Sequence, residues 1–262
     1  MRKKTVYRIC LLLVIFSSVS ILIEYFNYQK ETKNTKIPSV EKIIKEKKDI
    51  DYKDSKEEEK KQVEPYVNEL PTYRQQYNNE MIMGKLEIPN LNISSLVTRA
   101  QNNSFYLNNN LYNQYDGLGV PFFDYRDTAL MTNKQINIYG HNTRNEKFFD
   151  RLPFINLEAY TDKNIFQHYK DIYLSIDEAK LHYKVIAVKI IDGTNNEHMK
   201  VIFRSDEDFI QHIRKLLQNT LYKESNLEIT SEDRIIVLQV CHYNPPNTYL
   251  LIIGKEEREE KW

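Results

Sequence analysis

The pattern of hydrophobic and polar residues divides the chain into three regions. An almost unbroken apolar run extends from about Ile9 to Phe26, and four basic residues stand within the first eight positions. A helix needs roughly 20 apolar residues to cross a bilayer, and a basic flank stays in the cytoplasm. We therefore predict a cytoplasmic flank at residues 1–8, a single transmembrane anchor at residues 9–27, and an extracellular remainder.

The alternative for this apolar run is a cleaved signal peptide. The run is long for the apolar part of a signal, and it lacks an Ala-x-Ala-like cleavage site. Lys, Glu, Asp and Asn dominate residues 28–62, as in KEKKDIDYKDSKEEEKK. Such a segment cannot bury enough apolar surface to offset its ordering entropy. We interpret residues 28–62 as a charged stalk and residues 63–262 as one exported domain.

Short strand patterns dominate this domain. In KLEI, Leu86 and Ile88 share one face, and Pro89 should end the strand. Two continuous apolar runs, DRIIVLQVC and TYLLIIGK, are typical of buried strands. Further strands are predicted in GVPFFDYRD, QINIYGHN, DIYLSI and AKLHYKVIAVKIIDG. The last two should form a hairpin with its turn at Asp177 and Glu178.

Helical patterns are fewer. VEPYVNELPTYRQQYNN has helical spacing that Pro71 should interrupt, and FFDRLPFINLEAYTDKNIFQHY predicts short helical turns. The clearest helix is SDEDFIQHIRKLLQNTL, where Ser205 is the expected N-cap and Asp208 the third helical residue. Its apolar face consists of Phe209, Ile213, Leu216 and Leu217. Many short strands with one late helix predict a mostly β barrel or sandwich.

Composition narrows the classes of function. The 262 residues include 37 basic and 37 acidic side chains, so the net charge gives no basic surface for nucleic acid. No internal repeat is present, and no His-x-x-x-His motif or pair of cysteines suggests a metal site. We therefore expect no nucleic acid, metal or cofactor.

The predicted domain has one cysteine, Cys241, because Cys10 lies in the predicted anchor. A leftover cysteine outside the membrane indicates an intermolecular disulfide or a reactive thiol, and the alternative is a small buried hydrophobic residue. Cys241 ends a predicted buried strand and opens the loop HYNPPNT, where a rigid element can present a side chain. This position favours a reactive thiol.

A reactive thiol needs a base or a positive neighbour, because the thiolate is the nucleophile. Among the six histidines, His141 follows Gly140 at the end of the predicted strand QINIYG, where glycine lets the backbone turn tightly. His242 adjoins Cys241 but would point to the other face of the strand. Two strand ends, each with one partner, can form a Cys–His pair without a sequential motif. We therefore predict that His141 is the partner of Cys241.

In order and spacing, NIYGHN, FFDRLPFI and a hydrophobic strand ending in Cys241 resemble a sortase. Sortases are membrane-anchored cysteine transpeptidases of Gram-positive bacteria. NNSFYLNNNLYNQYDGLGVPFFDYRD and the late helix are similar to class B sortases, and the resemblance extends from MGKLEIPNLNISSLV to YLLIIGK. It implies an eight-stranded β-barrel with N-terminal helices and one helix before the strand that ends at the cysteine.

The resemblance also implies roles and partners. Cys241 matches the nucleophile, and His141 matches the general acid/base. The implied reaction cleaves a C-terminal sorting signal, of the Asn-Pro-x-Thr-x type in class B, at the carbonyl of a Thr. An amine of the peptidoglycan cross-bridge or its precursor then resolves the thioester. The implied partners are a surface protein with a sorting signal, a cell-wall amine, and the membrane through the anchor.

One position departs from the family pattern. Where the family carries an arginine on the strand after the cysteine, this chain has Tyr249, and VLQVC replaces the family's Thr-Leu-x-Thr-Cys. A tyrosine hydroxyl donates one uncharged hydrogen bond, whereas an arginine offers five donors. Three hypotheses stay open: a transpeptidase that uses Tyr249, Arg126 or Arg204 instead; a catalytically impaired binding or assembly protein; and a peptidase that hydrolyses its acyl-enzyme.

The class B groove implies a set of substrate contacts. Core packing is the alternative for the three apolar members of this set, Leu107, Phe209 and Ile210. Gln239 and His242 flank the nucleophile in the sequence. The implied substrate-binding residues are Asn103, Leu107, Ser205, Phe209, Ile210, Gln239 and His242.

Overall fold

The computed structural model describes residues 66–257. The predicted cytoplasmic flank, anchor and stalk, at residues 1–8, 9–27 and 28–62, lie outside the described residues. Residues 63–65 and 258–262 of the predicted domain also lie outside them. Within residues 66–257, no helix is both long enough and apolar enough to cross a membrane.

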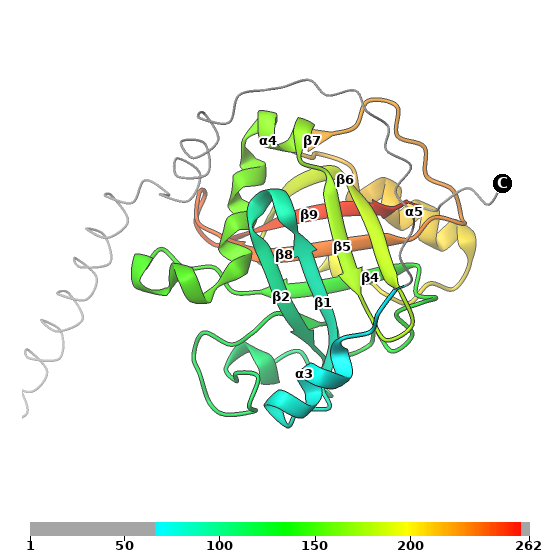
Figure 1. Ribbon diagram of the computed structural model, residues 1–262. Helices are drawn as coiled ribbons and strands as arrows, with labels where there is room; N and C mark the ends of the chain where they lie inside the picture. The colour runs from blue at the N-terminus through cyan, green and yellow to red at the C-terminus, as the bar shows by residue number, and fades with distance from the viewer. Residues whose placement is uncertain (1–65, 258–262) are drawn as a thin grey trace, which may run out of the picture. The chain divides into compact units, whose positions relative to one another are not determined.

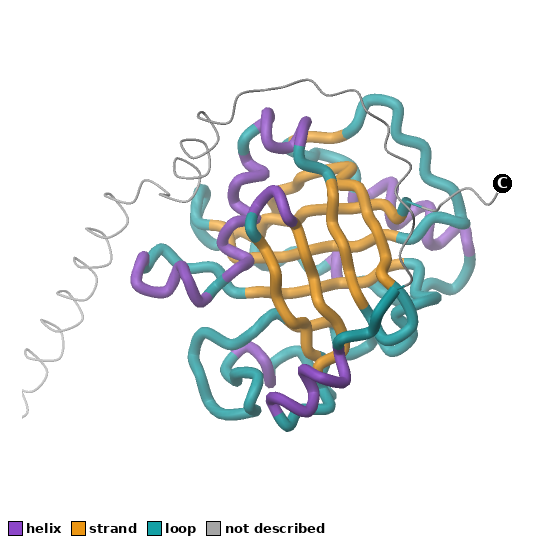
Figure 2. Tube along the Cα trace, viewed as in Figure 1, coloured by secondary structure: helices purple, strands orange, loops and turns teal. Residues whose placement is uncertain are grey.

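Nine strands form one sheet, and eight of them close into a barrel (Figure 1). The order is β5-β1-β2-β3-β4-β8-β9-β6, and β6 pairs back to β5, while the short β7 extends the sheet beside β6. Figure 2 shows the strands of the two sides of the barrel crossing each other. The strands are β1 Ile82–Ile88, β2 Ile93–Thr98, β3 Phe122–Phe123, β4 Gln135–Gly140, β5 Asp171–Ser175, β6 Lys180–Asp192, β7 Tyr222–Lys223, β8 Ile235–His242 and β9 Thr248–Glu256.

This closed barrel confirms the predicted fold and excludes the sandwich. Closure removes exposed strand edges, which would otherwise pair with other chains. β6 makes closure feasible because its 13 residues pair with β5, β7 and β9 along different parts of its length. The predicted hairpin of β5 and β6 is also present, with Ile176 N–H donating to Ala179 O across the turn at 2.9 Å.

β4 and β8 run parallel in the middle of the sheet order. Their register pairs six residues of each strand, from Gln135 opposite Ile235 to Gly140 opposite Val240. β9 then pairs antiparallel with β8, so that Tyr249 lies opposite Cys241. The long connection needed between parallel neighbours contains the helical turns, β5, β6 and the late helix. As a result, residues far apart in the sequence end at one edge of the barrel.

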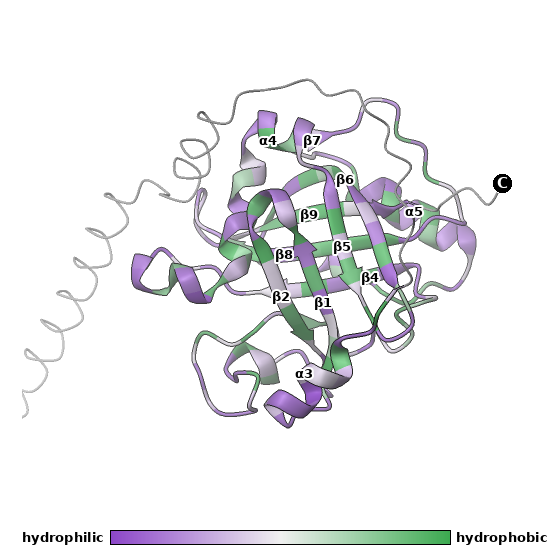
Figure 3. Cartoon of the chain, viewed as in Figure 1, coloured by the Kyte–Doolittle hydropathy of each residue, from purple (hydrophilic) through white to green (hydrophobic). Residues whose placement is uncertain are grey.

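The outer face of β8 and β9 is covered by α5 (Asp206–Leu216). Val237, Leu251 and Ile253 share a hydrophobic cluster with Phe209 and Ile213 of this helix. A helix can only lie outside a closed barrel, so the strand face in this cluster is the outer one. Since side chains alternate along a strand, Cys241 projects toward the same outer face as Val237. In Figure 3, α5 carries both hydrophobic and hydrophilic colours, as expected for a helix that packs one face on the barrel.

Ser205 caps α5 as predicted. Its side chain accepts a hydrogen bond from Asp208 N–H at 3.2 Å, and the Asp208 carboxylate accepts one from Arg204 N–H at 3.0 Å. Capping of this kind stabilises a helix by about 1 kcal/mol. Three acidic residues in the first turn also favour the positive end of the helix dipole. The cap therefore fixes where α5 begins, above the outer face of β8.

The prediction for Pro71 was wrong. The helix α3 (Leu70–Tyr77) has this proline in its first turn instead of breaking there. Proline is tolerated in the first helical turn because its missing N–H has no intrahelical acceptor in that turn. The predicted short helical turns are α4 (Lys163–His168), η3 (Glu146–Arg151) and η4 (Pro153–Thr161), and three more 3-10 turns are η1 (Pro89–Leu91), η2 (Phe105–Leu107) and η5 (Glu197–Met199).

Candidate active site

Cys241 and His141 lie at neighbouring strand ends, as the sequence predicted. Gly140, the last residue of β4, pairs with Val240 of β8, and each is followed directly by one member of the predicted pair. Both side chains are partly exposed, in contrast to most of the preceding strand residues. The parallel register therefore delivers a thiol and an imidazole to the same edge of the barrel.

Gly140 is required for a different reason from the one predicted. A Cβ built at this position would lie 2.3 Å from Cδ2 of Phe154, well inside van der Waals contact. Phe154 belongs to η4 and is buried. The glycine thus allows η4 to approach the end of β4 closely, and the chain turns after it without a left-handed backbone at this glycine.

The carbonyl of Leu107 fixes the proton position on His141. Nε2 of the ring lies 2.7 Å from Leu107 O. A carbonyl oxygen can only accept, so Nε2 carries a proton and donates it. In the neutral ring the free lone pair is then on Nδ1, and Nδ1 is the atom that could take a proton from a thiol. Leu107 therefore contributes to the site through its backbone.

At neutral pH, Cys241 is present as the protonated thiol and not as the thiolate. Burial raises the pKa of this thiol above its ordinary value, and the negative charge of Glu158 raises it further. Because the thiolate is the reactive species, a thiol of this kind needs a base when it acts as a nucleophile. The histidine at the neighbouring strand end, His141, has the chemistry of such a base.

Tyr249 occupies the outer face opposite Cys241. The cross-strand register of β8 and β9 pairs the two residues directly. Tyr249 is partly buried against the cluster under α5, and its ring centroid lies 6.5 Å from that of His198. Leu251 and Ile253 follow on the same face and pack under α5, outside the barrel. Tyr249 thus faces the same side as the thiol.

The η5 turn covers the strand face next to this tyrosine. His198 is buried, and its Nε2 forms a hydrogen bond with Oε1 of Gln239, two residues before the cysteine. Arg126 holds the same turn from the other side, because its guanidinium binds both carboxylate oxygens of Asp124 and donates to Met199 O at 2.6 Å. The guanidinium of Arg126 is therefore already bonded to Asp124 and the η5 turn. Arg204, just before α5, is exposed.

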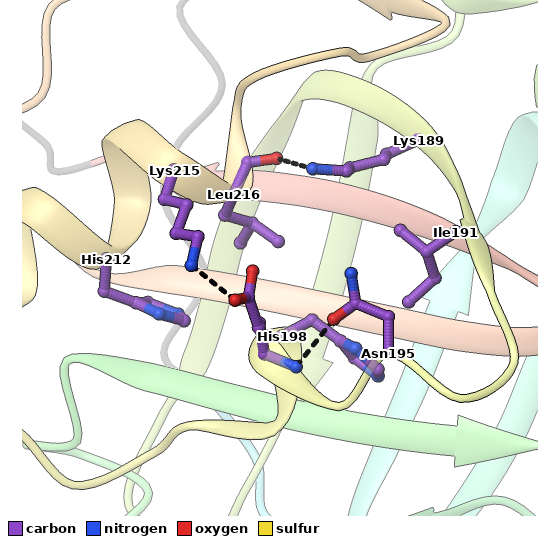
Figure 4. Close-up of a pocket in the computed structure, with 8 residues that line it drawn as sticks. Lys189, Ile191, Asn195, His198, His212, Lys215 and Leu216 are labelled. Atoms are coloured by element: carbon purple, nitrogen blue, oxygen red, sulfur yellow. Dashed lines mark hydrogen bonds and ion pairs between the residues drawn. The ribbon is translucent and has the colours of Figure 1, made fainter.

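A recess between η5 and α5 is lined by His198, His212 and Lys189 among others (Figure 4). Burial lowers the pKa of His198, and burial together with the charge of Lys200 lowers that of His212 to about 4. Both rings are therefore neutral at neutral pH. The cavity volume is about 20 Å³, which is room for one water molecule. This recess is too small to hold a peptide.

The structure separates the predicted substrate contacts into two groups. Phe209 is fully buried under α5, so the core-packing alternative holds for it, and His242 is only 5% exposed. Neither side chain is open to a substrate in this structure. The others lie at the surface or partly exposed: Asn103, Leu107, Ser205, Ile210 and Gln239.

Several of these partly exposed residues already have structural contacts. The Asn103 amide donates to Asp124 at 2.9 Å and accepts from Tyr125 N–H at 2.8 Å. The Ser205 hydroxyl caps α5, and the Gln239 side chain binds His198. Each of these side chains therefore has a structural role in the fold, whether or not it also contacts a substrate.

Sequence reasoning missed a polar group beneath the two strand ends. Asn142 follows His141, His242 follows Cys241, and both bind the buried carboxylate of Glu158 on η4. A signal was present for Glu158, because an acidic residue inside the apolar segment PFINLEAY must find a partner if the segment is buried. Arg144 was also missed; its guanidinium donates to Tyr243 O and lies 4.7 Å from the Tyr243 ring centroid.

Comparison with known proteins finds similarity to sortase B proteins. No protein family model matches the chain. Sortase B of Listeria monocytogenes is 29% identical over 168 residues, which are 64% of this chain and 65% of that protein. Sortase B of Staphylococcus aureus is 22% identical over 179 residues, 68% of this chain and 70% of that protein. The chain thus matches just under two thirds of the length of the Listeria relative.

Solved structures show the same fold. Sortase B of Clostridium perfringens superposes with a TM-score of 0.65 at 24% identity, over 72% of this chain and all of that one. Listeria sortase B gives a TM-score of 0.60 at 27% identity, over 71% of this chain and 99% of that one. A sortase B in complex with triglycine gives 0.63 at 18% identity, over 90% and 97%. By sequence and by fold, this chain is a relative of the class B sortases.

Proposed function

We propose that this protein is a sortase B-like cysteine transpeptidase that joins a surface protein to a cell-wall amine. The observation that carries the proposal is the parallel register of β4 and β8, which brings His141 and Cys241 to one edge of the barrel. A partly exposed thiol and a histidine with a defined tautomer are the two groups that acyl transfer requires.

The first half-reaction is acylation. His141 takes the proton of Cys241, and the sulfur attacks the carbonyl carbon of the Thr in an Asn-Pro-x-Thr-x sorting signal. The C–N bond of the scissile peptide breaks, and the histidinium returns the proton to the leaving amine. The product is a thioester between Cys241 and the Thr of the surface protein.

The second half-reaction is transfer to an amine. The acceptor nitrogen of a peptidoglycan cross-bridge or precursor attacks the thioester carbon, and His141 takes the proton that this nitrogen loses. The C–S bond then breaks, and the histidinium returns the proton to the sulfur, which regenerates the thiol and the neutral imidazole. The complex of a related fold with triglycine supports an acceptor of this type. We place the domain outside the cell, held by the predicted anchor at residues 9–27.

The negative charge on the carbonyl oxygen needs a donor in both steps. Tyr249 faces the same side as the thiol from the opposite strand position, so its hydroxyl is our candidate. Loss of one such donor typically slows acyl transfer by about 100- to 1000-fold. An uncharged donor in place of the family arginine should give an active but slow enzyme.

The test is formation of an acyl-enzyme by the full-length protein. Incubation with an Asn-Pro-x-Thr-x peptide should add the mass of the acyl fragment to the tryptic peptide that contains Cys241. Cys241→Ala should keep the circular dichroism spectrum and lose the adduct. Peptide cleavage that persists in Cys241→Ala would contradict the proposal.

A second candidate function is a catalytically impaired binding or assembly protein, which Tyr249 favours. A peptide that binds without forming an adduct would support it. Adding triglycine to the reaction distinguishes the third hypothesis, a peptidase, from a transpeptidase. Transfer gives the triglycine-linked product, whereas a peptidase gives only the free acid.

A further inference from the structure

The two strand ends are joined underneath by one side-chain amide. Nδ2 of Asn142, the residue after His141, donates to Cys241 O at 2.8 Å and to Glu158 Oε1 at 2.8 Å. Its two hydrogens are therefore both used. Asn142 Oδ1 accepts from Thr143 N–H, and Asn142 O accepts from the Tyr243 hydroxyl, each at 2.8 Å. The side chain of the residue after His141 is thus bonded directly to the backbone carbonyl of Cys241.

His242 binds Glu158 from the other strand end. Its Nδ1 lies 2.9 Å from both carboxylate oxygens, and its Nε2 lies 2.5 Å from Asn244 O. Both partners can only accept, so both ring nitrogens donate and the ring is an imidazolium. Burial opposes this charge, but the Glu158 carboxylate and the Asn244 carbonyl outweigh it and raise the pKa of His242. The result is a buried ion pair under the nucleophile.

Glu158 is held in place by its own element. It lies on η4, the element that also contains Phe154. Gly140 lets Phe154, in the first turn of η4, lie close to the end of β4. The carboxylate is 3% exposed, Asn142 is 8% exposed and His242 is 5% exposed. Leaving any one of these polar groups buried without its partners would be costly, so the three positions are mutually constrained.

We propose that Glu158 is a positioning residue, which acts through Asn142 and His242 to hold His141 and Cys241 at a fixed separation. This inference rests on the proposed function, in which the two residues form the catalytic pair. The side-chain hydrogen bonds of Glu158 go to Asn142 and His242, the residues directly after that pair. A displacement of about 1 Å in a reacting group can slow a reaction by about 100-fold. All three network residues are buried, so the proposed role does not depend on contact with a substrate.

The first measurement compares acylation with simple alkylation of Cys241. Asn142→Ala removes the amide that joins the strand ends and keeps the ion pair. We expect the acylation rate at saturating peptide to fall by about 10- to 100-fold, with the half-saturating peptide concentration unchanged. Alkylation by iodoacetamide needs only the thiolate, so its rate at a pH high enough to ionise the thiol without a base should stay the same. Mass spectrometry of the tryptic peptides separates Cys241 from Cys10.

Glu158→Gln is the second variant and should show the same split between acylation and alkylation. Asp171→Asn is the matched control, because Asp171 also pairs with a histidine, His182, at 2.7 Å, but on β5 and β6. It should leave both rates unchanged. Circular dichroism checks the fold of each variant, and if one variant does not fold, the other decides.

The second measurement does not depend on acylation. If the imidazole is positioned beside the thiol, His141→Ala should change the pH profile of alkylation, and Asn142→Ala should reproduce that change. The charged or titratable groups around the thiol are His141, Arg144, Glu158, His242, Tyr243 and Tyr249.

The outcomes separate the two proposals. Normal acylation in Asn142→Ala, or an alkylation pH profile that does not follow that of His141→Ala, overturns the positioning role. Parallel loss of acylation and alkylation also overturns it, because that pattern means general damage. Failure of the unsubstituted protein to form any acyl-enzyme instead overturns the proposed function, and the alkylation profiles still decide the positioning role.

Discussion

At the scale of single residues, the site depends on how each side chain is oriented by its strand. Cys241 and Tyr249 face outward because they share a cross-strand position on the face that α5 covers farther along. His242 faces the opposite way and is buried with Glu158. Cys241 and His242 are consecutive residues of β8, so the thiol and the buried ion pair of His242 with Glu158 lie on opposite faces of the strand.

Tyr249→Phe should slow acylation at least about tenfold, which corresponds to about 1.4 kcal/mol in the barrier. The change removes only the hydroxyl, the proposed donor to the oxyanion. Tyr249→Arg should restore or raise the rate, since it supplies a charged donor at the family position. Rates of thioester formation under single-turnover conditions measure both effects. Equal rates for Tyr249→Phe and the unsubstituted protein would move the search for the donor to backbone amides.

Asp124 should make stability depend on pH in the acid range. Burial alone would raise the pKa of this carboxyl, but hydrogen bonds from Arg126, Asn103 and Tyr139 outweigh burial and lower it to about 2. A lowered pKa stabilises the fold above about pH 4, the range of an unfolded aspartate, and the gain disappears as the pH falls through about 2. The contribution at neutral pH is about 2 kcal/mol.

Urea denaturation at a series of pH values from about 5 down to about 2 measures this dependence, because that range spans the two pKa values. Asp124→Asn should lower stability at neutral pH and flatten the acid slope. Asp150→Asn, at an exposed carboxylate, is the control. An unchanged acid slope in Asp124→Asn would contradict the assignment.

The sequence predicted the positions of the proposed catalytic pair but not its surroundings, for a physical reason. Cys241 and His141 could be found because each ends an apolar strand, and strand patterns are local. Glu158 and Asn142 could not be assigned, because their partners lie 84 and 99 positions away and depend on the register of β4 against β8. The match of Tyr249 to the family position did not specify its partner, and the antiparallel register of β8 and β9 places it opposite Cys241.

At the scale of elements, most predicted strands and the late helix are present. The alternation around Leu86 and Ile88 gives β1, and Pro89 ends it. The misassigned element is α3, because a proline inside a helical pattern looks the same in the sequence whether it breaks a helix or begins one. The local backbone before the proline decides between the two.

Ser205→Ala should destabilise the protein by about 1 kcal/mol, because it leaves Asp208 N–H without its cap. α5 covers the outer face beside Gln239 and Tyr249, so fraying of its first turn should also weaken peptide binding. Thermal unfolding measures the first effect and a peptide titration the second. Ser94→Ala, at an exposed position of β2, is the matched control. Equal melting temperatures for the two variants would show that the cap is not needed.

At the scale of the whole molecule, barrel closure was predicted from the resemblance and not from strand patterns alone. Patterns of short strands are compatible with a sandwich, and the pairing of β5 with both β1 and β6 that closes the barrel is a long-range property. The N-terminal prediction rests on hydrophobicity and basic flanks only.

Protease treatment of intact protoplasts should remove the domain and leave a membrane-bound fragment that includes residues 1–27. The expected reason is an uncleaved anchor with the domain outside the cell. Immunoblotting with tags at the two termini distinguishes the fragments, and lysed protoplasts provide the control for protease access. Mature protein in the culture medium that lacks its first residues would instead identify a cleaved signal.

The parallel pairing of β4 with β8 also has a consequence for the order of synthesis and export. β8 and β9 are the last strands in the described chain, yet β9 lies between β8 and β6 in the interior of the sheet order. A nascent chain that emerges N-terminus first therefore presents His141 long before its partner arrives. Long-range pairing of this kind is also slow to form. Under the proposed function, the thiol acquires its base only after nearly the whole domain has been delivered, and we expect incompletely exported chains to be inactive.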